Sequence, residues 1–156
     1  MGQEIERKFL ILKNDYKAQS SRSFRITQGY LSSNPERSVR VRIKGESGFI
    51  TVKGATIASG ISRFEWEKEI PVQEAETLLK ICEPGVIDKI RYEIKCGTHL
   101  FEVDEFLGNN KGLVIAEVEL TQEHEVFARP DWLGREVTGD VRYYNAVLAK
   151  HPYTTW

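Results

Sequence analysis

The sequence predicts an α+β fold built on one closed or nearly closed antiparallel β-sheet with two helices beside it. Eight short segments alternate apolar and polar residues with a period of two, which is typical of half-buried strands. Only two segments have the spacing of apolar residues that indicates a helix. No internal repeat, low-complexity tract or linker divides the 156 residues. Because that length suits one compact domain, we expect a single domain over residues 1–156.

The eight predicted strands are rich in Val, Ile, Phe and Tyr and are separated by turn residues such as Asn34-Pro35 and Gly45. They span residues 3–11, 24–31, 37–44, 48–54, 62–70, 86–96, 98–107 and 113–121. Short strands joined by tight turns indicate an antiparallel barrel or sandwich.

The two predicted helices span residues 71–82 and 140–150. Pro71 suits the first turn of the first helix, and Pro84 follows its end. In the second helix Asp140 is the expected N-cap, and Pro152 comes after the last turn.

Composition excludes several classes of protein. Lys and Arg (22) nearly balance Asp and Glu (23), which argues against nucleic-acid binding through bulk basicity. The N-terminus lacks an apolar stretch long enough for a signal peptide, and nothing downstream is long enough to span a membrane. Two cysteines, Cys82 and Cys96, are too few for a disulfide framework. We therefore expect a cytoplasmic protein with no nucleic-acid or membrane partner, and the sequence leaves a homodimer open.

Seven of the eight predicted strands carry charged residues on one face and apolar residues on the other. Residues at i and i+2 share a face of a strand, so Glu4, Glu6 and Lys8 lie opposite Ile5 and Phe9. The corresponding pairs on the later strands are Arg40 and Arg42, Thr51 and Lys53, Glu65 and Glu67, Lys89 and Arg91, Glu102 and Asp104, and Glu117 and Glu119.

Two interpretations fit this pattern. The charged faces are either the solvated outside of an ordinary barrel or the lining of a charged lumen. Surface strands usually mix Thr, Ser and Gln with Lys, whereas these faces are almost purely charged and the signs are sorted by strand. Two arginines at i and i+2, such as Arg40 and Arg42, are also costly to align without an anion. If the charges line a lumen, the carboxylates suit Mg²⁺ or Mn²⁺ and the basic groups suit phosphate oxygens.

The order of the charged motifs resembles the CYTH superfamily, the triphosphate tunnel metalloenzymes. Glu-x-Glu-x-Lys at residues 4–8 resembles that family's N-terminal signature. Further matching segments follow in the family's order: Val-Arg-Val-Arg (39–42), Thr-Val-Lys-Gly (51–54), Lys-Ile-Arg-Tyr (89–92), Glu-Val-Asp (102–104) and Ala-Glu-Val-Glu-Leu (116–120). The resemblance covers essentially the whole chain. It implies an eight-stranded antiparallel β-barrel that forms a tunnel, with flanking helices, and that binds a triphosphate and two divalent cations.

The resemblance also implies a role for each charged residue. The expected metal ligands are Glu4, Glu6, Glu117 and Glu119, with Asp104 as a candidate for the second metal. The expected triphosphate clamp is Lys8, Arg40, Arg42, Lys53, Lys89 and Arg91, which we count with Asp104 as the catalytic group. Glu102 is a candidate for the second metal or for positioning water, and Glu65 and Glu67 are expected to orient basic residues.

The activity expected from this site is metal-dependent hydrolysis of a triphosphate. Inorganic tripolyphosphate is favoured over nucleoside triphosphates, because no motif for recognising a base or ribose stands out, and no P-loop is present. The alternatives are an adenylate cyclase of the class IV type and a non-catalytic module that binds polyphosphate or nucleotides. On the last predicted helix, Arg142, Tyr143 and Lys150 either reach the tunnel or only dock the helix.

Overall fold

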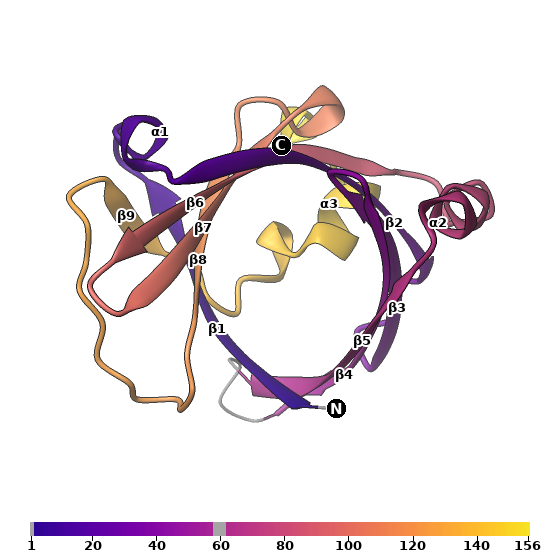
Figure 1. Cartoon of the computed structure of the whole chain (residues 1–156), viewed down its shortest axis with the longest axis horizontal. Coiled ribbons are helices and arrows are strands. Elements are labelled where there is room, and N and C mark those ends of the chain that lie inside the picture. The colour runs from indigo at the N-terminus through magenta and orange to yellow at the C-terminus, as the bar shows by residue number, and fades with distance from the viewer. Residues whose placement is uncertain (1, 58–61) are drawn as a thin grey trace.

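The strands form a ring that encloses a lumen (Figure 1). This computed structural model describes residues 2–57 and 62–156. The sheet order is β5-β4-β3-β2-β6-β7-β8-β1-β9, and a further pairing of β1 with β5 closes eight of these nine strands into a barrel. Every pairing is antiparallel. The predicted eight-stranded antiparallel barrel is therefore confirmed.

The strand bounds follow the predicted ones closely. The strands are β1 (Gly2–Ile11), β2 (Arg22–Ser32), β3 (Arg37–Lys44), β4 (Ser47–Thr56), β5 (Ser62–Ile70), β6 (Ile87–Cys96), β7 (His99–Phe106), β8 (Val114–Glu119) and β9 (Leu133–Glu136). The helices are α1 (Tyr16–Gln19), α2 (Val72–Leu79) and α3 (Asn145–Lys150), with short 3₁₀ helices η1 (Gly108–Asn110), η2 (Val141–Tyr143) and η3 (Tyr153–Thr155).

The largest difference from the predicted elements concerns the C-terminal helix. The helix expected over 140–150 is divided into η2 and α3, because Tyr144 between them is extended, with ψ 134°. Asp140 does act as a cap, since its side chain accepts a hydrogen bond from the Arg142 amide at the start of η2. The helix expected over 71–82 ends earlier, at Leu79. The short elements α1 and β9 have no periodic pattern and were not predicted.

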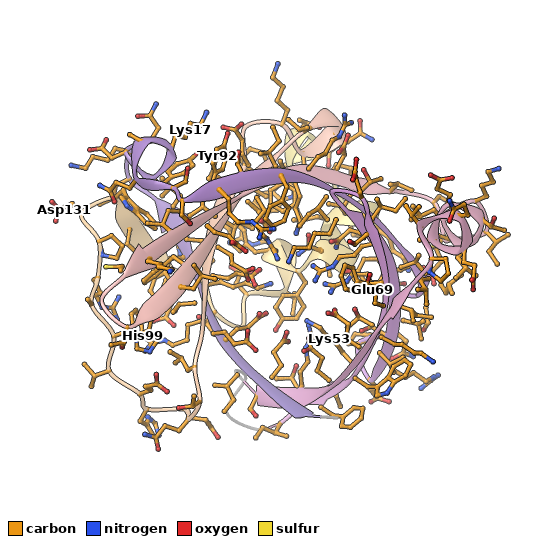
Figure 2. The ribbon with its side chains drawn as sticks, viewed as in Figure 1. Lys17, Lys53, Glu69, Tyr92, His99 and Asp131 are labelled. Carbon is orange, nitrogen blue, oxygen red and sulfur yellow. The ribbon has the colours of Figure 1, made fainter. Side chains whose placement is uncertain are left out.

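The main apolar core lies outside the barrel wall. Phe9, Val103 and Val118 point away from the lumen, because they alternate with the charged residues of β1, β7 and β8. They pack against Tyr16 of α1 and against Trp132 of the segment between β8 and β9, both nearly inaccessible to solvent. The strands thus bury their apolar face outwards, and their charged face is free to line the lumen. Figure 2 shows Lys53 projecting into the ring, whereas Asp131 lies outside it.

A second, smaller apolar cluster closes one end of the lumen. Ile87, Phe106 and Ile115 lie on the inner faces of β6, β7 and β8, and Leu148 of α3 packs against them, fully buried. Helix α3 accordingly lies across the ring in Figure 1. The main chain approaches closely here, since a Cβ at Gly85 would lie 2.0 Å from the carbonyl oxygen of Ala149. The tunnel therefore has an apolar closed end and a charged interior.

Candidate functional site

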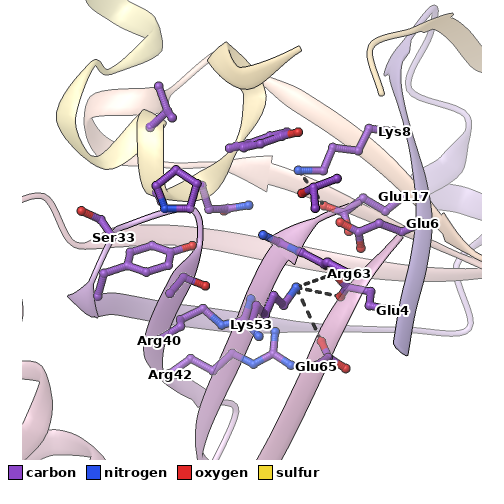
Figure 3. Close-up of a pocket in the computed structure, with 18 of the residues that line it drawn as sticks. Glu4, Glu6, Lys8, Ser33, Arg40, Arg42, Lys53, Arg63, Glu65 and Glu117 are labelled. Atoms are coloured by element: carbon purple, nitrogen blue, oxygen red, sulfur yellow. Dashed lines mark hydrogen bonds and ion pairs between the residues drawn. The ribbon is translucent and has the colours of Figure 1, made fainter. Parts of the chain in front are cut away.

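The barrel encloses a cavity of about 230 Å³ lined mainly by charged side chains. Seven are basic and seven acidic: Lys8, Arg40, Arg42, Lys53, Arg63, Lys89 and Arg91, and Glu4, Glu6, Glu65, Glu67, Glu102, Glu117 and Glu119. Figure 3 shows members of this set, among them Lys8 of β1, Arg40 of β3, Lys53 of β4 and Glu65 of β5, converging from several strands. Charged groups are rarely buried unless they are paired or bind ions. The charged faces seen in the sequence are therefore the lining of a lumen and not a solvated exterior.

We define the basic wall as Arg40, Arg42, Lys89 and Arg91. Its first half, Arg40 and Arg42, lies on β3. Arg40 donates a hydrogen bond from Nη2 to Thr51 Oγ1 at 3.3 Å, and Thr51 donates in turn to Glu67 at 2.7 Å. Both guanidinium groups also lie near Glu67 Oε2, at 3.7 Å from Arg40 and 3.6 Å from Arg42. Burial, together with Arg40 and Arg91, lowers the pKa of Arg42 to about 10. One carboxylate therefore shares two cations, and the positive charge there exceeds the negative.

The second half of the basic wall, Lys89 and Arg91, lies on β6, and the Asp104 carboxylate pairs with both residues. Arg91 makes a bidentate contact with Asp104, at 2.7 and 2.8 Å, and Lys89 Nζ lies 2.7 Å from Asp104 Oδ2. Burial opposes ionisation of Asp104, but Arg91 and Lys89 hold the pKa of this carboxyl well below its usual range. Burial lowers the pKa of Lys89 to about 8, even though Asp104 opposes that change. Asp104 thus fixes the position of two buried cations.

The acid wall, which we define as Glu4, Glu6, Glu117 and Glu119, lies on the adjacent strands β1 and β8. The strand register places Glu6 directly opposite Glu119, and like charges opposite each other destabilise a sheet. Burial raises the pKa of Glu6 to about 8, with Glu117 and Glu4 adding to the increase. Burial, Glu4 and Glu102 likewise raise the pKa of Glu119. The wall therefore concentrates negative charge that a cation would neutralise.

The chemistry of the acid wall suits a divalent metal. Four carboxylates on two neighbouring strands offer the hard oxygen ligands that Mg²⁺ and Mn²⁺ prefer. Within residues 2–57 and 62–156, no three Asp, Glu, His or Cys side chains already surround a single point as a finished metal cage. The fit is thus one of donor type and charge, and Mg²⁺ commonly completes its coordination with water and phosphate oxygens.

Lys53 joins the acid wall to β4 and β5. Its ammonium group donates to both oxygens of Glu4, at 2.9 and 2.7 Å, and lies 3.5 Å from Glu65 (Figure 3). Arg63 donates to the same Glu4 carboxylate at 3.3 Å. Burial would raise the pKa of Glu4, but Lys53 and a hydrogen bond with Glu65 lower it to about 2. Burial and Glu4 raise the pKa of Glu65 to about 7.

The C-terminal segment contributes four residues to the cavity lining, Tyr144, Asn145, Ala146 and Val147, and the first two contact lysines of the site. Asn145 accepts a hydrogen bond from Lys89 Nζ at 3.0 Å, and the Tyr144 ring centroid lies 4.9 Å from Lys8 Nζ. The sequence offered Arg142, Tyr143 and Lys150 for this role, but none of the three lines the cavity. Arg142 pairs with Asp140, Tyr143 belongs to the apolar cluster at the closed end, and Lys150 pairs with Glu83. These three residues dock the segment.

The structure brings nearly all of the residues expected at the site into one cavity. Asp104 differs, because it lies behind the lining at 2% exposure with both oxygens occupied by Arg91 and Lys89. Lys8 lies 3.9 Å from Glu117, and Glu102 lies 3.2 Å from Arg91. The sequence analysis missed Arg63, which the same alternation could have found, since it is two positions before Glu65. It also missed Tyr30, Tyr144 and Asn145, which no charge pattern marks.

No helix in the described part of the chain is long and apolar enough to cross a membrane.

Comparisons of sequence show which proteins the chain resembles. The CYTH domain family matches residues 2–150. An inorganic triphosphatase from Acetivibrio thermocellus is 51% identical over 154 residues, covering 98% of this chain and 97% of the relative. An inorganic triphosphatase from Nitrosomonas europaea is 37% identical over 151 residues, covering 94% and 96%.

Comparisons of structure agree. A crystal structure of an inorganic triphosphatase matches with a TM-score of 0.65 and 35% identity, covering 94% of this chain and 97% of the other. A protein from Hippeastrum, described as a putative adenylyl cyclase with a dominant triphosphatase activity, matches with a TM-score of 0.60. It covers 76% and 80% of the two chains at 13% identity, so this likeness concerns the fold alone. By its sequence over nearly its whole length and by its tunnel, the chain belongs to the CYTH domain family.

Proposed function

We propose that this protein is a divalent-metal-dependent triphosphatase that hydrolyses inorganic tripolyphosphate inside its tunnel. The observation that carries the proposal is the cavity in which seven basic and seven acidic side chains face one another. A ligand that satisfies both kinds of charge is polyanionic and carries bound cations. The two inorganic triphosphatases that share 51% and 37% identity with the chain support the same activity.

The basic residues bind and orient the triphosphate. Arg40, Arg42 and Arg91 offer bidentate contacts to phosphate oxygens, and Lys8, Lys53 and Lys89 act as point charges. Phosphoryl transfer to water needs alignment and charge neutralisation more than covalent catalysis. A cluster whose members are already held by Asp104, Glu67 and Asn145 loses little freedom when the substrate binds. We assign Asp104 to this positioning role, since its oxygens already accept from two cations.

The acid wall holds the metal. We propose two ions, Mg²⁺ or Mn²⁺, bound through Glu4, Glu6, Glu117 and Glu119 together with phosphate oxygens. Bound ions of this kind neutralise phosphate charge and lower the pKa of a coordinated water. The protein's own contribution is to place four carboxylates beside the basic wall. Glu65 and Glu67 hold Lys53, Arg40 and Arg42, and Glu102 holds Arg91.

Inorganic tripolyphosphate is the favoured substrate because the lumen is charged over most of its lining and α3 closes one end. A nucleoside triphosphate would also have to place a base and a ribose, which offer no charge to this lining. An adenylate cyclase would need an adenine pocket and a positioned 3′-hydroxyl. A non-catalytic binding module would not need a wall of four carboxylates for metal, and the four that we propose as ligands all line the cavity.

The test is product identity under controlled metal. Purified protein is incubated with tripolyphosphate or with ATP, in Mg²⁺, in Mn²⁺ and in EDTA, and products are separated by chromatography. We expect pyrophosphate and phosphate from tripolyphosphate at a rate equal to or above that with ATP, and no hydrolysis in EDTA. Cyclic AMP as the main product from ATP, with tripolyphosphate left intact, would contradict the proposal. Turnover that survives EDTA would contradict the metal assignment.

A further inference from the structure

Gln28 is a fully buried polar residue on the inner face of β2. Its exposure is 0%, and neither its amide oxygen nor its amide nitrogen has a hydrogen-bond partner among the residues that the structure describes. Residues 26, 28 and 30 share one face of the strand, and Tyr30 on that face lines the cavity. A buried amide without a partner lowers stability, so a residue of this kind calls for a functional explanation.

The strands on either side of β2 place one charged and one apolar residue next to Gln28. The register places Gln28 directly opposite Arg42 of β3 on one side and Ile87 of β6 on the other. Among the described residues, the Nε atom of Arg42 is also buried without a partner, as is that of Arg40. An unpaired acceptor, Gln28 Oε1, and an unpaired donor, Arg42 Nε–H, thus lie on side chains at directly opposite positions of adjacent strands. Ile87 is apolar, and its side chain has no group that can form a hydrogen bond with Gln28.

Arg42 is only loosely held in this arrangement. Its Nη2 atom lies 3.6 Å from Glu67 Oε2, a carboxylate that it shares with Arg40 and Thr51. A polyanion in the cavity would engage the terminal nitrogens of the guanidinium group, and the Nε–H group, which has no partner among the described residues, would still need an acceptor. Gln28 Oε1 is an unpaired acceptor at the strand position directly opposite Arg42.

We propose that Gln28 is a positioning residue for Arg42, an inference that rests on the proposed binding of a triphosphate. In the bound state Gln28 Oε1 accepts a hydrogen bond from Arg42 Nε, which leaves both terminal nitrogens of the guanidinium for phosphate oxygens. Gln28 itself does not line the cavity, so it acts through Arg42 and does not touch the substrate. An amide without a partner among the described residues is the cost in stability of having this acceptor in place.

The test is the near-isosteric variant Gln28→Met, which keeps the volume and removes the acceptor. We expect its melting temperature without ligand to equal or exceed that of the wild type, because an unpaired buried amide is removed. We expect the dissociation constant of tripolyphosphate, measured by calorimetric titration in EDTA, to rise about tenfold, as for loss of one hydrogen bond to a charged group. The KM for tripolyphosphate with Mg²⁺ should rise by a similar factor, with kcat nearly unchanged.

A double-mutant cycle identifies the partner. Lysine has a methylene group where arginine has Nε–H. Gln28→Met should therefore have little further effect on tripolyphosphate binding in an Arg42→Lys background. In the matched Arg40→Lys background it should keep its full effect. Unchanged binding in Gln28→Met, or an equal effect in both backgrounds, would overturn the proposal. If the wild type binds tripolyphosphate in EDTA but does not hydrolyse it with metal, the proposed function fails while the titrations still test Gln28.

Discussion

The two walls of the tunnel handle buried charge in opposite ways. In the basic wall, the protein supplies partners for the cations: Asp104 for Lys89 and Arg91, and Glu67 for Arg40 and Arg42. In the acid wall, Glu4 is paired with Lys53, but no ion pair joins Glu6 or Glu119 to a basic residue in the part of the chain that the structure describes.

The difference indicates what each wall does. A buried charge without a partner is costly, and a wall that keeps such charges gains from an added ion. The β6 half of the basic wall, Lys89 and Arg91, is held in position by Asp104 before the substrate arrives, as electrostatic preorganisation requires. The acid wall would be completed by the cations that we propose, because Glu6 and Glu119 form no ion pair with a basic residue among the described residues. Removing a partner should therefore destabilise the basic wall, whereas removing a carboxylate from the acid wall should mainly affect turnover.

The largest effect is expected in the basic wall from Asp104→Ala. The change leaves two buried cations without their common carboxylate, which costs about 3–5 kcal/mol in the free energy of unfolding. Urea denaturation of the metal-free protein measures this loss. Glu102→Gln on the same strand is the control, because this partly exposed carboxylate pairs with Arg91 at 3.2 Å, and such pairs contribute about 1 kcal/mol or less. Equal stability of the two variants would contradict the role assigned to Asp104.

In the acid wall, Glu6→Gln should separate activity from stability. Turnover of tripolyphosphate with Mg²⁺ should fall about 100-fold or more, since a lost metal ligand removes several kcal/mol of transition-state stabilisation. The melting temperature without metal should stay the same or rise, because burial and the neighbouring Glu117 and Glu4 all disfavour an ionisable carboxyl at this position. Glu69→Gln, an exposed carboxylate of β5, should change neither quantity. A metal-free Glu6→Gln protein that melts well below the wild type would show that the two walls do not differ.

A smaller effect is expected from Asn145→Ala, which tests whether the C-terminal segment supports the basic wall. Lys89 would lose its hydrogen bond to Asn145 while its ion pair with Asp104 remains. We expect the KM for tripolyphosphate to rise about three- to tenfold, as for loss of one hydrogen bond to a charged group. The exposed Asn109 provides the control, and Asn109→Ala should leave steady-state kinetics unchanged. Identical kinetics for both variants would place Asn145 outside the functional site.

The smallest effect concerns a carboxylate outside both walls. Hydrogen bonds from Thr121 and His99 lower the pKa of Glu125 to about 2. Because the folded-state pKa lies below the unfolded value of about 4.3, the ionised group stabilises the fold above pH 4.3 and loses this effect as the pH falls towards 2. The melting temperature, measured from pH 5 to pH 2.5, should therefore fall less steeply for Glu125→Gln than for the wild type. Parallel curves would show that these hydrogen bonds add no stability.

The alternation of charged and apolar residues was enough to predict which charged residues share a face. Side chains at i and i+2 of a strand share a face whatever the sheet does, so pairs such as Arg40 and Arg42 had to lie together. The alternation alone did not decide whether that face was inside or outside. The decision rests on what covers the opposite face, and the covering residue Trp132 lies in an irregular segment without periodicity.

The parts that the sequence did not predict depend on contacts between distant segments. Asn145 reaches Lys89 only because the extended Tyr144 turns α3 into the end of the barrel. Asp104 and Glu102 share a face of β7, yet their depths differ, because Arg91 and Lys89 cover the first and the second stays partly exposed. Strand β9 consists of four residues with no period and forms because β1 has a free edge beyond its pairing with β5.

The closure of the barrel also sets an order of events during synthesis. Strand β1 leaves the ribosome first, yet Glu6 pairs with Glu119, more than a hundred residues later in the chain. Such distant pairing makes folding slow and leaves the edges of β1 and β5 open to other chains while synthesis continues. Because the acid wall spans β1 and β8, its four carboxylates come together only once the last barrel strand has docked. Metal bound at this wall would therefore report that the nascent barrel has closed.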